Sequence, residues 1–560
     1  GGSTGWRGEQ GSERRQHDGY GEPDEAQEKM TWEDRVWFPI FTSVFFGMFF
    51  YAGVKNVHWR TMVVERRMFV KDLSRGWFLG LPQDLSDPQW KTLRKFFPLL
   101  FSLLVGHVLA SKLARTTFCK GSSKSLSNFH AAVNLIFVII LHGPKVVWPL
   151  LTNITVFLIG QHFRGSIMNP VLTWLVCLLV LFSSDYYGGF ETVRLAPMFG
   201  SLLSFWDDFS GLYSWQTQFN LSMLRLISFN TELYWSQNQH MLSPKQTNLH
   251  LYTQENFSLS NFLAYVLYMP LYIAGPIAPY MTWLEGLKSP QKSLTTRATV
   301  FMLARTFLYI LLVEVMLHLY MYVSINNNRT WYMIEGDYMP GWEVAVGGFF
   351  TLQFMYMKFL SIWRFFRCWA LLDGIDCPEN MKRCVNNNYS FSGFWRQWHA
   401  SLNAWIIRYM YIPLGGRKTQ FWNVWVIFTF VGLWHDLMWR WLAWAWLNCT
   451  FFCLELAVTA LGESKACEGW RRSRWWRYIL ALCGSMNISF LVIANLSIMH
   501  GFQGSTEFLL AIFDNQGERS SPPAGLVTAL KIFSFLGVAQ LSMVGLRKHE
   551  RVVGKRPLRY

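Results

Sequence analysis

Long apolar segments limit what this chain can fold into more than any other feature. The hydrocarbon core of a membrane is about 30 Å thick and needs about 20 apolar residues per helix, with every backbone polar group paired internally. Such segments therefore predict an all-α, polytopic membrane protein with about eleven crossings. The candidate spans begin near Val36, Phe96, Val133, Val146, Val171, Phe262, Val300, Val344, Trp422, Trp441, Ile479 and Leu526.

Composition supports lipid as the main surrounding. The chain is 51% hydrophobic and only 15% charged, against roughly 25% charged residues in soluble domains. A net charge of +16 is typical of proteins that bind nucleic acid, but the Lys and Arg residues here interrupt apolar segments instead of clustering on a soluble face. We expect the bilayer, and no nucleic acid, as partner. The nine cysteines have neither CxxC pairs nor zinc-ligand spacing, so no disulfide framework and no metal site is predicted.

Charge divides the chain into three parts. Residues 1–35 carry five Lys or Arg against nine Asp or Glu and are predicted to form a disordered acidic arm. Residues 36–546 form the membrane domain, and residues 547–560 a basic tail. Lys and Arg favour the cytosolic side of a membrane. The tail and the basic segment 54–96 are therefore expected in the cytosol, and the N-terminal arm in the lumen.

Three apolar stretches are too polar or too broken for simple spans. They cover residues 196–235, 364–392 and 394–416. Non-helical backbone at membrane depth survives only where protein buries it or where it lines a wet cavity, so we expect re-entrant elements that wall a site. Residues 395–416 are predicted to form one amphipathic helix, because apolar residues recur there at three- and four-residue steps.

Two histidines in apolar surroundings are the candidate catalytic residues. His435 follows an apolar run, and His399 lies in the sequence FWRQWH at 394–399. Burial favours the neutral imidazole, which can accept a proton as a general base. A hydrogen-bonded packing role is the alternative for each histidine. The sequence has no P-loop or HExxH motif, and its one GxSxG match, at residues 1–5, lies in the arm predicted to be disordered and not at a strand-to-helix elbow.

Several ordered motifs closely resemble the membrane-bound O-acyltransferase superfamily, and within it the glycerol-uptake-protein branch, which is related to Hedgehog acyltransferase. The resemblance runs from about Val36 to the C-terminus. The motifs are RLISFN at 225–230, AGPI at 274–277, LLDGIDCPEN at 371–380, RCVNNNYS at 383–390, FWRQWH at 394–399, RYMYIPLGG at 408–416 and LWHD at 433–436.

The resemblance implies a fold with a central tunnel, in which acyl-CoA enters from the cytosolic side and meets its acceptor. It implies His435 as the catalytic base and His399 as its partner in the active site. It also implies an endoplasmic-reticulum membrane location. Cys384 matches a cysteine that binds haem iron in Hedgehog acyltransferases, which makes haem a candidate cofactor. The expected substrate-binding residues are Arg396, Asn403, Arg408, Trp434 and Asp436.

The resemblance leaves three functions open. The first is transfer of a long-chain acyl group from acyl-CoA to a lipid hydroxyl, with the sn-2 position of a lyso-glycosylphosphatidylinositol (lyso-GPI) anchor as the expected acceptor. The second is protein acylation, as by Hedgehog acyltransferase. The third is a transporter or a non-catalytic membrane partner linked to glycerol uptake.

Overall fold

The structure is a computed structural model. It describes residues 73–190, 211–242, 249–290, 294–321, 341–388, 390–473 and 475–513, with short pieces within 35–51, 323–327 and 532–543. The predicted acidic arm, except for Arg35, and the basic tail lie outside the described residues. So do residues 196–210 of the predicted stretch 196–235 and the start of the candidate span near Leu526, of which only pieces within 532–543 are described.

Long helices dominate the described residues, which confirms the predicted all-α, polytopic membrane class. Seven segments are long and apolar enough to cross a membrane: 88–116, 123–163, 168–186, 296–319, 344–373, 439–463 and 476–501. The second of these contains two helices, because Gly143 adopts φ +58° after α3. The long helices are α2 (Pro88–Thr116), α3 (Ser123–His142), α4 (Val147–Phe163), α5 (Met168–Tyr186), α8 (Trp215–Gln237), α12 (Thr296–Leu319), α14 (Gly341–Asp373), α17 (Gln420–His435), α18 (Trp439–Glu463) and α20 (Trp476–Phe513).

Short elements connect and cover these helices. A two-stranded antiparallel sheet pairs β1 (Leu73–Arg75) with β2 (Pro82–Asp84). The short helices are η2 (Gly143–Val146), η4 (Gln239–Met241), η5 (Leu249–Leu251), η6 (Gln254–Phe257), α9 (Leu259–Val266), α10 (Met269–Tyr272), α11 (Tyr280–Lys288), α15 (Phe391–Gln397), α16 (Ala400–Ile406), η8 (Ile407–Tyr411), η9 (Gly416–Thr419), η10 (Lys465–Cys467) and α19 (Glu468–Arg471).

Two predicted spans differ from the structure. The segment near Phe262 was expected to cross the membrane, but α9 has only eight residues and so spans only about 12 Å. Pro270 and Pro276 interrupt the chain after it, and the short helices that result are almost entirely buried in protein. The segment near Trp422 forms α17, whose 16 residues are also fewer than the roughly 20 that a full crossing needs.

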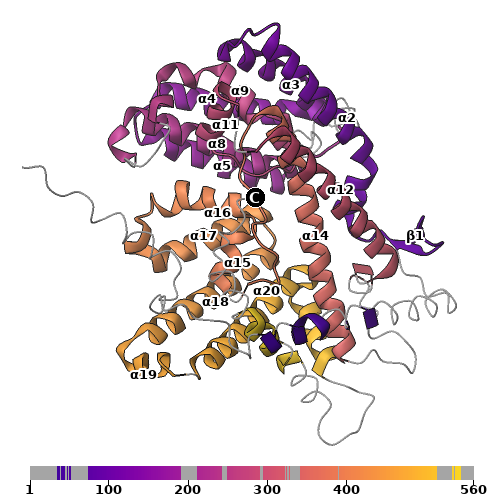
Figure 1. Cartoon of the computed structure of the whole chain (residues 1–560). Coiled ribbons are helices and arrows are strands. Elements are labelled where there is room, and N and C mark those ends of the chain that lie inside the picture. Colours follow the sequence, from indigo (N-terminus) through magenta and orange to yellow (C-terminus); the bar gives the residue numbers. More distant parts are fainter. Residues whose placement is uncertain are drawn as a thin grey trace, which may run out of the picture.

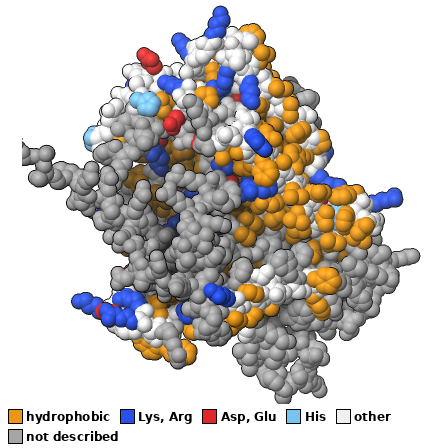
Figure 2. Space-filling model, in the orientation of Figure 1, with side chains coloured by type: hydrophobic (Ala, Val, Ile, Leu, Met, Phe, Trp, Pro, Cys, Tyr) orange, Lys and Arg blue, Asp and Glu red, His pale blue; other side chains and the backbone are white. Residues whose placement is uncertain are grey.

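The helices form two groups joined by α14. Figure 1 shows α2 to α12 gathered on one side and α15 to α20 on the other, with α14 running along both. Helix α8 lies inside the first group, and most of its side chains are buried. Figure 2 shows a broad apolar surface on the side of α2 and α12. Exposed Leu109, Leu113 and Phe301 belong to these two helices, as expected for a surface that faces lipid.

The predicted amphipathic helix over 395–416 is wrong, because the chain breaks at His399. His399 has φ +48° and ψ +47° and precedes α16 as its N-cap residue. The loop that follows α14 supplies the acceptors for the new helix: Ala400 N–H donates to the Asn380 carbonyl (3.0 Å) and Ser401 N–H to Asn380 Oδ1 (3.1 Å). Because helix periodicity continues across the break, the sequence pattern alone did not reveal it. Residues 364–373 likewise continue α14, and irregular backbone begins only at Gly374.

Candidate active site

His435 is the last residue of α17 and lies against the start of α18. A close approach of the two helices at Gly432 makes this possible, since a Cβ there would lie 3.0 Å from both the Ala445 Cβ and the Trp441 carbonyl oxygen. The His435 ring stacks on the Trp441 indole, with centroids 4.8 Å apart and planes at 13°. Trp444 meets the same ring edge-on at 5.8 Å.

His399 is held in an uncommon backbone conformation. A non-glycine residue in the left-handed region costs roughly 1–3 kcal/mol, and such residues cluster at functional sites. The contacts of Asn380 with the start of α16 hold the backbone there. The imidazole stacks on Trp363 of α14, with centroids 4.4 Å apart and planes at 13°.

Trp434 contacts the rings of both histidines. Its ring centroid is 4.8 Å from that of His435 and 6.4 Å from that of His399. Burial first, and the nearby His435 second, lower the pKa of His399 to about 3. His399 is therefore neutral at physiological pH and offers one donor and one acceptor nitrogen.

Both imidazoles are accessible. His435 is exposed and His399 is half-buried. Both rings can therefore meet an entering molecule, as the side chains of an active site must.

Asn220 of α8 fixes the position of Trp434. The Asn220 side-chain amide donates to the Trp434 carbonyl oxygen (2.8 Å), and the Trp434 indole donates to the Asn220 carbonyl oxygen (2.6 Å). This reciprocal pair joins residues 214 positions apart in the sequence. It ties the end of α17, and with it His435, to the buried helix α8.

The predicted substrate-binding residues differ in whether they lie next to His435 and His399. Trp434 contacts both histidines, and Asp436 adjoins His435 in the chain, with Oδ1 accepting from Met438 N–H (3.2 Å). Asn403 is half-buried one turn after His399. Arg396 is exposed and donates to Ser392. Contact of these residues with substrate stays a prediction.

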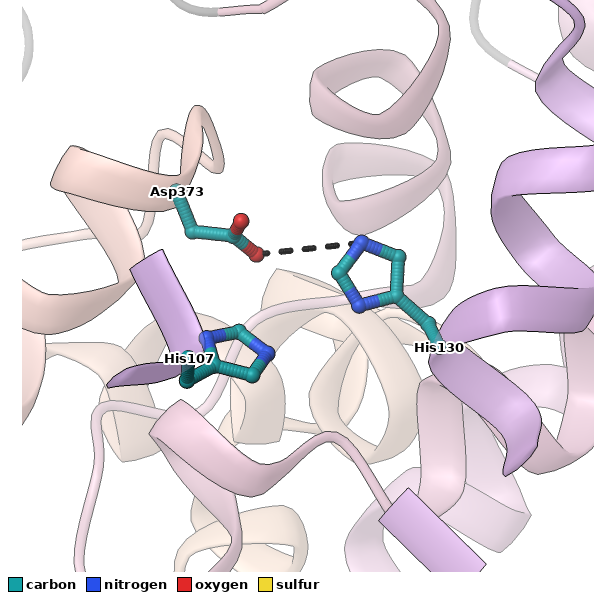
Figure 3. A group of neighbouring side chains, drawn as sticks. All are labelled: His107, His130 and Asp373. Carbon is teal, nitrogen blue, oxygen red and sulfur yellow. Dashed lines mark ion pairs between the residues drawn. The ribbon is translucent and has the colours of Figure 1, made fainter. Parts of the chain in front are cut away.

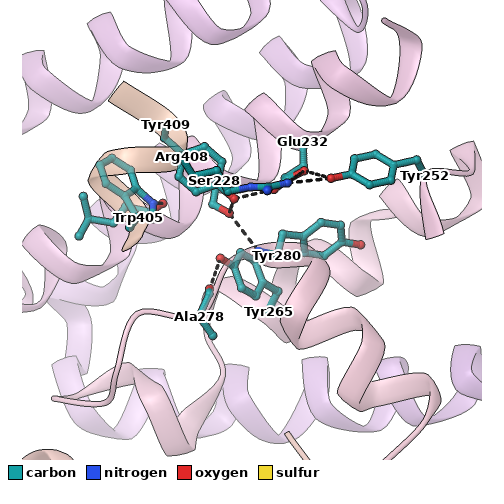
Figure 4. A network of polar contacts seen from close by, with 10 residues as sticks. Ser228, Glu232, Tyr252, Tyr265, Ala278, Tyr280, Trp405, Arg408 and Tyr409 are labelled. Atoms are coloured by element: carbon teal, nitrogen blue, oxygen red, sulfur yellow. Dashed lines mark hydrogen bonds and ion pairs between the residues drawn. The ribbon is translucent and has the colours of Figure 1, made fainter. Parts of the chain in front are cut away.

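Arg408 forms a buried polar network with α8, shown in Figure 4. Its Nε lies 2.8 Å from Glu232 Oε1, and its Nη2 lies 3.1 Å from Oε2. Tyr252 and Tyr409 also donate their hydroxyl groups to Glu232. Because Glu232 already neutralises the guanidinium, binding a phosphate of coenzyme A would require Arg408 to share its charge. Arg408 as a phosphate ligand therefore stays a prediction that this ion pair weakens.

Comparison with known proteins places this geometry in a family. The sequence profile of the membrane-bound O-acyltransferase family matches residues 167–497, which include both histidines. The chain belongs to the membrane-bound O-acyltransferase family. It is 32% identical over 464 residues to "Membrane-bound O-acyltransferase gup1" of Schizosaccharomyces pombe, covering 79% of this chain and 78% of that protein. It is 30% identical over 497 residues to "Membrane-bound O-acyltransferase GUP1" of Saccharomyces cerevisiae, covering 83% of each.

The name of a more distant relative gives a protein cysteine as the acyl acceptor. The chain is 26% identical over 456 residues to "Protein-cysteine N-palmitoyltransferase HHAT" of Mus musculus, covering 78% of this chain and 84% of that protein. These comparisons confirm the predicted resemblance to the membrane-bound O-acyltransferases and an acyltransferase activity. Acyl-CoA is the general co-substrate of the family.

Haem at Cys384, which the resemblance implies, stays a prediction. Sulfur ligation of haem iron requires a thiolate. Burial raises the pKa of the Cys384 thiol above its ordinary value, although hydrogen bonds from Asn386 and Tyr356 partly offset it. The surroundings therefore favour the neutral thiol when no metal is bound, whereas a coordinating iron would deprotonate it. The chemistry that we propose for this membrane-bound O-acyltransferase does not involve haem.

A second buried polar cluster escaped the sequence reasoning. Figure 3 shows His107, His130 and Asp373, which come from α2, α3 and α14. Their ligand-type atoms all lie within 4.8 Å of one another. The Trp369 indole donates to His107 Nδ1 (3.2 Å), so the neutral His107 ring carries its proton on Nε2 and has no free lone pair to offer a metal.

Proposed function

We propose that the chain transfers a long-chain fatty acyl group from acyl-CoA to the sn-2 hydroxyl of a lyso-GPI anchor, as one step of anchor remodelling. The observation that carries the proposal is the pair of accessible histidines, His435 and His399, whose rings both contact Trp434. The name O-acyltransferase of a 32% identical relative supports an oxygen acceptor over a peptide amine.

His435 is the proposed general base. It takes the proton of the acceptor hydroxyl while the hydroxyl oxygen attacks the thioester carbonyl carbon. The new C–O bond forms, the C–S bond breaks, and the departing thiolate of coenzyme A receives the proton from His435. Because a thioester is already activated, the protein chiefly supplies this base and the alignment of two substrates.

Substrate binding follows from the walls of the site. Apolar and aromatic side chains hold an acyl chain by burial, at roughly 0.8 kcal/mol per CH₂ group. Arg417 and Lys418 are exposed in η9. They are the proposed contacts for the phosphates of coenzyme A, since Glu232 already pairs with Arg408.

His399 is the proposed orienting partner, and its substitutions should rank in a defined order. Asn tolerates the left-handed conformation and retains a donor and an acceptor, so His399→Asn should keep measurable turnover. His399→Ala loses the hydrogen bond to a developing charge and should lower kcat by about 10 to 150-fold. Turnover of labelled acyl-CoA in detergent measures both variants. Equal rates for the two variants would contradict an orienting role.

Lipid analysis of cells tests the acceptor. Mass spectrometry of GPI anchors from cells with and without the protein should show accumulation of the lyso form when the protein is absent. Unchanged anchors together with a lost acyl modification on a secreted protein would favour protein acylation. Unchanged anchors together with altered glycerol uptake would favour the transporter alternative.

The proposed location is the endoplasmic-reticulum membrane, with the N-terminus luminal and the C-terminus cytosolic. The excess of Lys and Arg in segment 54–96 and in the tail supports this orientation. Protease protection in sealed microsomes should spare an N-terminal tag and remove a C-terminal one. The reverse pattern would invert the proposed topology.

A further inference from the structure

Buried indole N–H groups without a partner gather at His435. In the described part of the chain, four tryptophans have a buried Nε1 with no hydrogen-bond acceptor: Trp283, Trp395, Trp441 and Trp444. Trp283 lies on α11 among tyrosines. Trp441 and Trp444 contact His435, and Trp395 contacts Trp444.

The three indoles form one continuous cluster. Trp441 and Trp444 project from neighbouring positions on α18, and their rings meet edge-on at 5.9 Å and 86°. Trp395 of α15 meets Trp444 at 5.7 Å and 72°. The His435 ring contacts both Trp441 and Trp444. Trp441 and Trp444 of α18 thus lie against the proposed base, and Trp395 of α15 lies against Trp444.

Other tryptophans in the protein have acceptors for the same group. A buried donor without an acceptor is costly, and phenylalanine would provide a similar apolar ring without that cost. The indole N–H finds a protein acceptor at Trp90, Trp215, Trp369, Trp405 and Trp434. Packing alone therefore does not account for three unpaired donors in one place. A ligand oxygen would satisfy them.

We propose that Trp441 and Trp444 donate hydrogen bonds to the carbonyl oxygen of the acyl thioester, with Trp395 supporting the Trp444 ring. This inference rests on the proposed acyl transfer. When the hydroxyl oxygen of the acceptor attacks the carbonyl carbon, the π electrons of the C=O bond move onto the carbonyl oxygen. Donors fixed in a site that excludes water stabilise the resulting negative charge. A lone pair of the carbonyl oxygen then re-forms the C=O double bond as the C–S bond breaks, and the negative charge leaves on the sulfur of coenzyme A, which takes the proton from His435.

The test removes the N–H and keeps an aromatic ring. Trp441→Phe and Trp444→Phe should each lower kcat by about 10²-fold or more, the usual effect of losing one oxyanion donor. Trp283→Phe is the matched control, because it removes the fourth unpaired indole far from His435 and should leave kcat within about threefold of wild type. Size-exclusion profiles in detergent confirm that each variant is folded.

A binding measurement separates carbonyl recognition from general damage to the site. Two unreactive analogues of acyl-CoA serve as probes: a ketone with CH₂ in place of sulfur, and a thioether with CH₂ in place of the carbonyl group. Wild type should bind the ketone about tenfold more tightly than the thioether. In Trp441→Phe and Trp444→Phe the ratio of the two dissociation constants should fall toward one. Trp283→Phe should keep it.

The outcomes distinguish the inference from the proposed function. If both variants keep the wild-type kcat and the wild-type preference for the ketone, the indoles do not bind the carbonyl, although acyl transfer stands. The inference also fails if Trp283→Phe loses the preference to the same extent. If wild-type protein transfers no acyl group, the proposed function fails, and the binding preference still decides whether the indoles recognise a carbonyl oxygen.

Discussion

Replacing His435 with alanine should abolish acyl transfer and leave the protein folded. Loss of a general base lowers turnover by about 10²- to 10⁴-fold. The imidazole is exposed at the end of α17, so its removal costs far less stability than emptying a packed apolar core. Release of coenzyme A from labelled acyl-CoA, measured in detergent with a lyso-lipid acceptor, checks the rate.

The control for His435→Ala is an exposed histidine far from the site. His162 on α4 is exposed and packs only edge-on against its neighbour Phe163 among the aromatic rings, so His162→Ala should keep the wild-type rate. Both variants should elute from a size-exclusion column as wild type does. A wild-type rate for His435→Ala would remove its catalytic assignment and favour a transporter or a non-catalytic partner.

Glu232→Ala should destabilise the protein strongly. The carboxylate is fully buried and accepts hydrogen bonds from Arg408, Tyr252 and Tyr409. Its removal leaves a guanidinium, with only 27% of its side chain exposed, without its counter-charge. Breaking a buried pair in this way costs about 3–5 kcal/mol. Thermal unfolding in detergent should show a large fall in Tm.

An exposed ion pair provides the matched control for Glu232. Glu468 and Arg472 lie one turn apart, with side-chain exposures of 52% and 80%, and such pairs contribute at most about 1 kcal/mol. Glu468→Ala should therefore leave Tm close to that of wild type. Similar Tm values for Glu232→Ala and Glu468→Ala would show that the α8 network does not stabilise the fold.

The helices that face lipid could be predicted from the sequence, and the buried short ones could not. A span leaves a local pattern of about 20 apolar residues, so the segments near Phe96, Val300 and Ile479 match helices of the structure. A short helix enclosed by protein is equally apolar. The segment near Phe262 therefore resembled a span, although contacts with distant helices make α9 a buried element.

The site was only partly predictable for a related reason. His435 and His399 were identifiable as polar residues in apolar surroundings. Glu232 and Asn220 were not, because they meet Arg408 and Trp434 from positions 176 and 214 residues away. The one available signal was that Glu232 and Asn220 both lie in the stretch 196–235, which is too polar for a simple span. The left-handed backbone of His399 left no trace in the sequence, since Asn380 holds it through space.

The most direct test of the account is acyl transfer by the purified protein in lipid nanodiscs. Labelled acyl-CoA and a lyso-GPI lipid are supplied together with a peptide that offers an N-terminal amine. We predict that label appears as an ester at the sn-2 position of the lipid, with one coenzyme A thiol released per ester formed. Label that stays on coenzyme A, or that moves to the peptide amine while the lipid remains unlabelled, would contradict lipid O-acyl transfer.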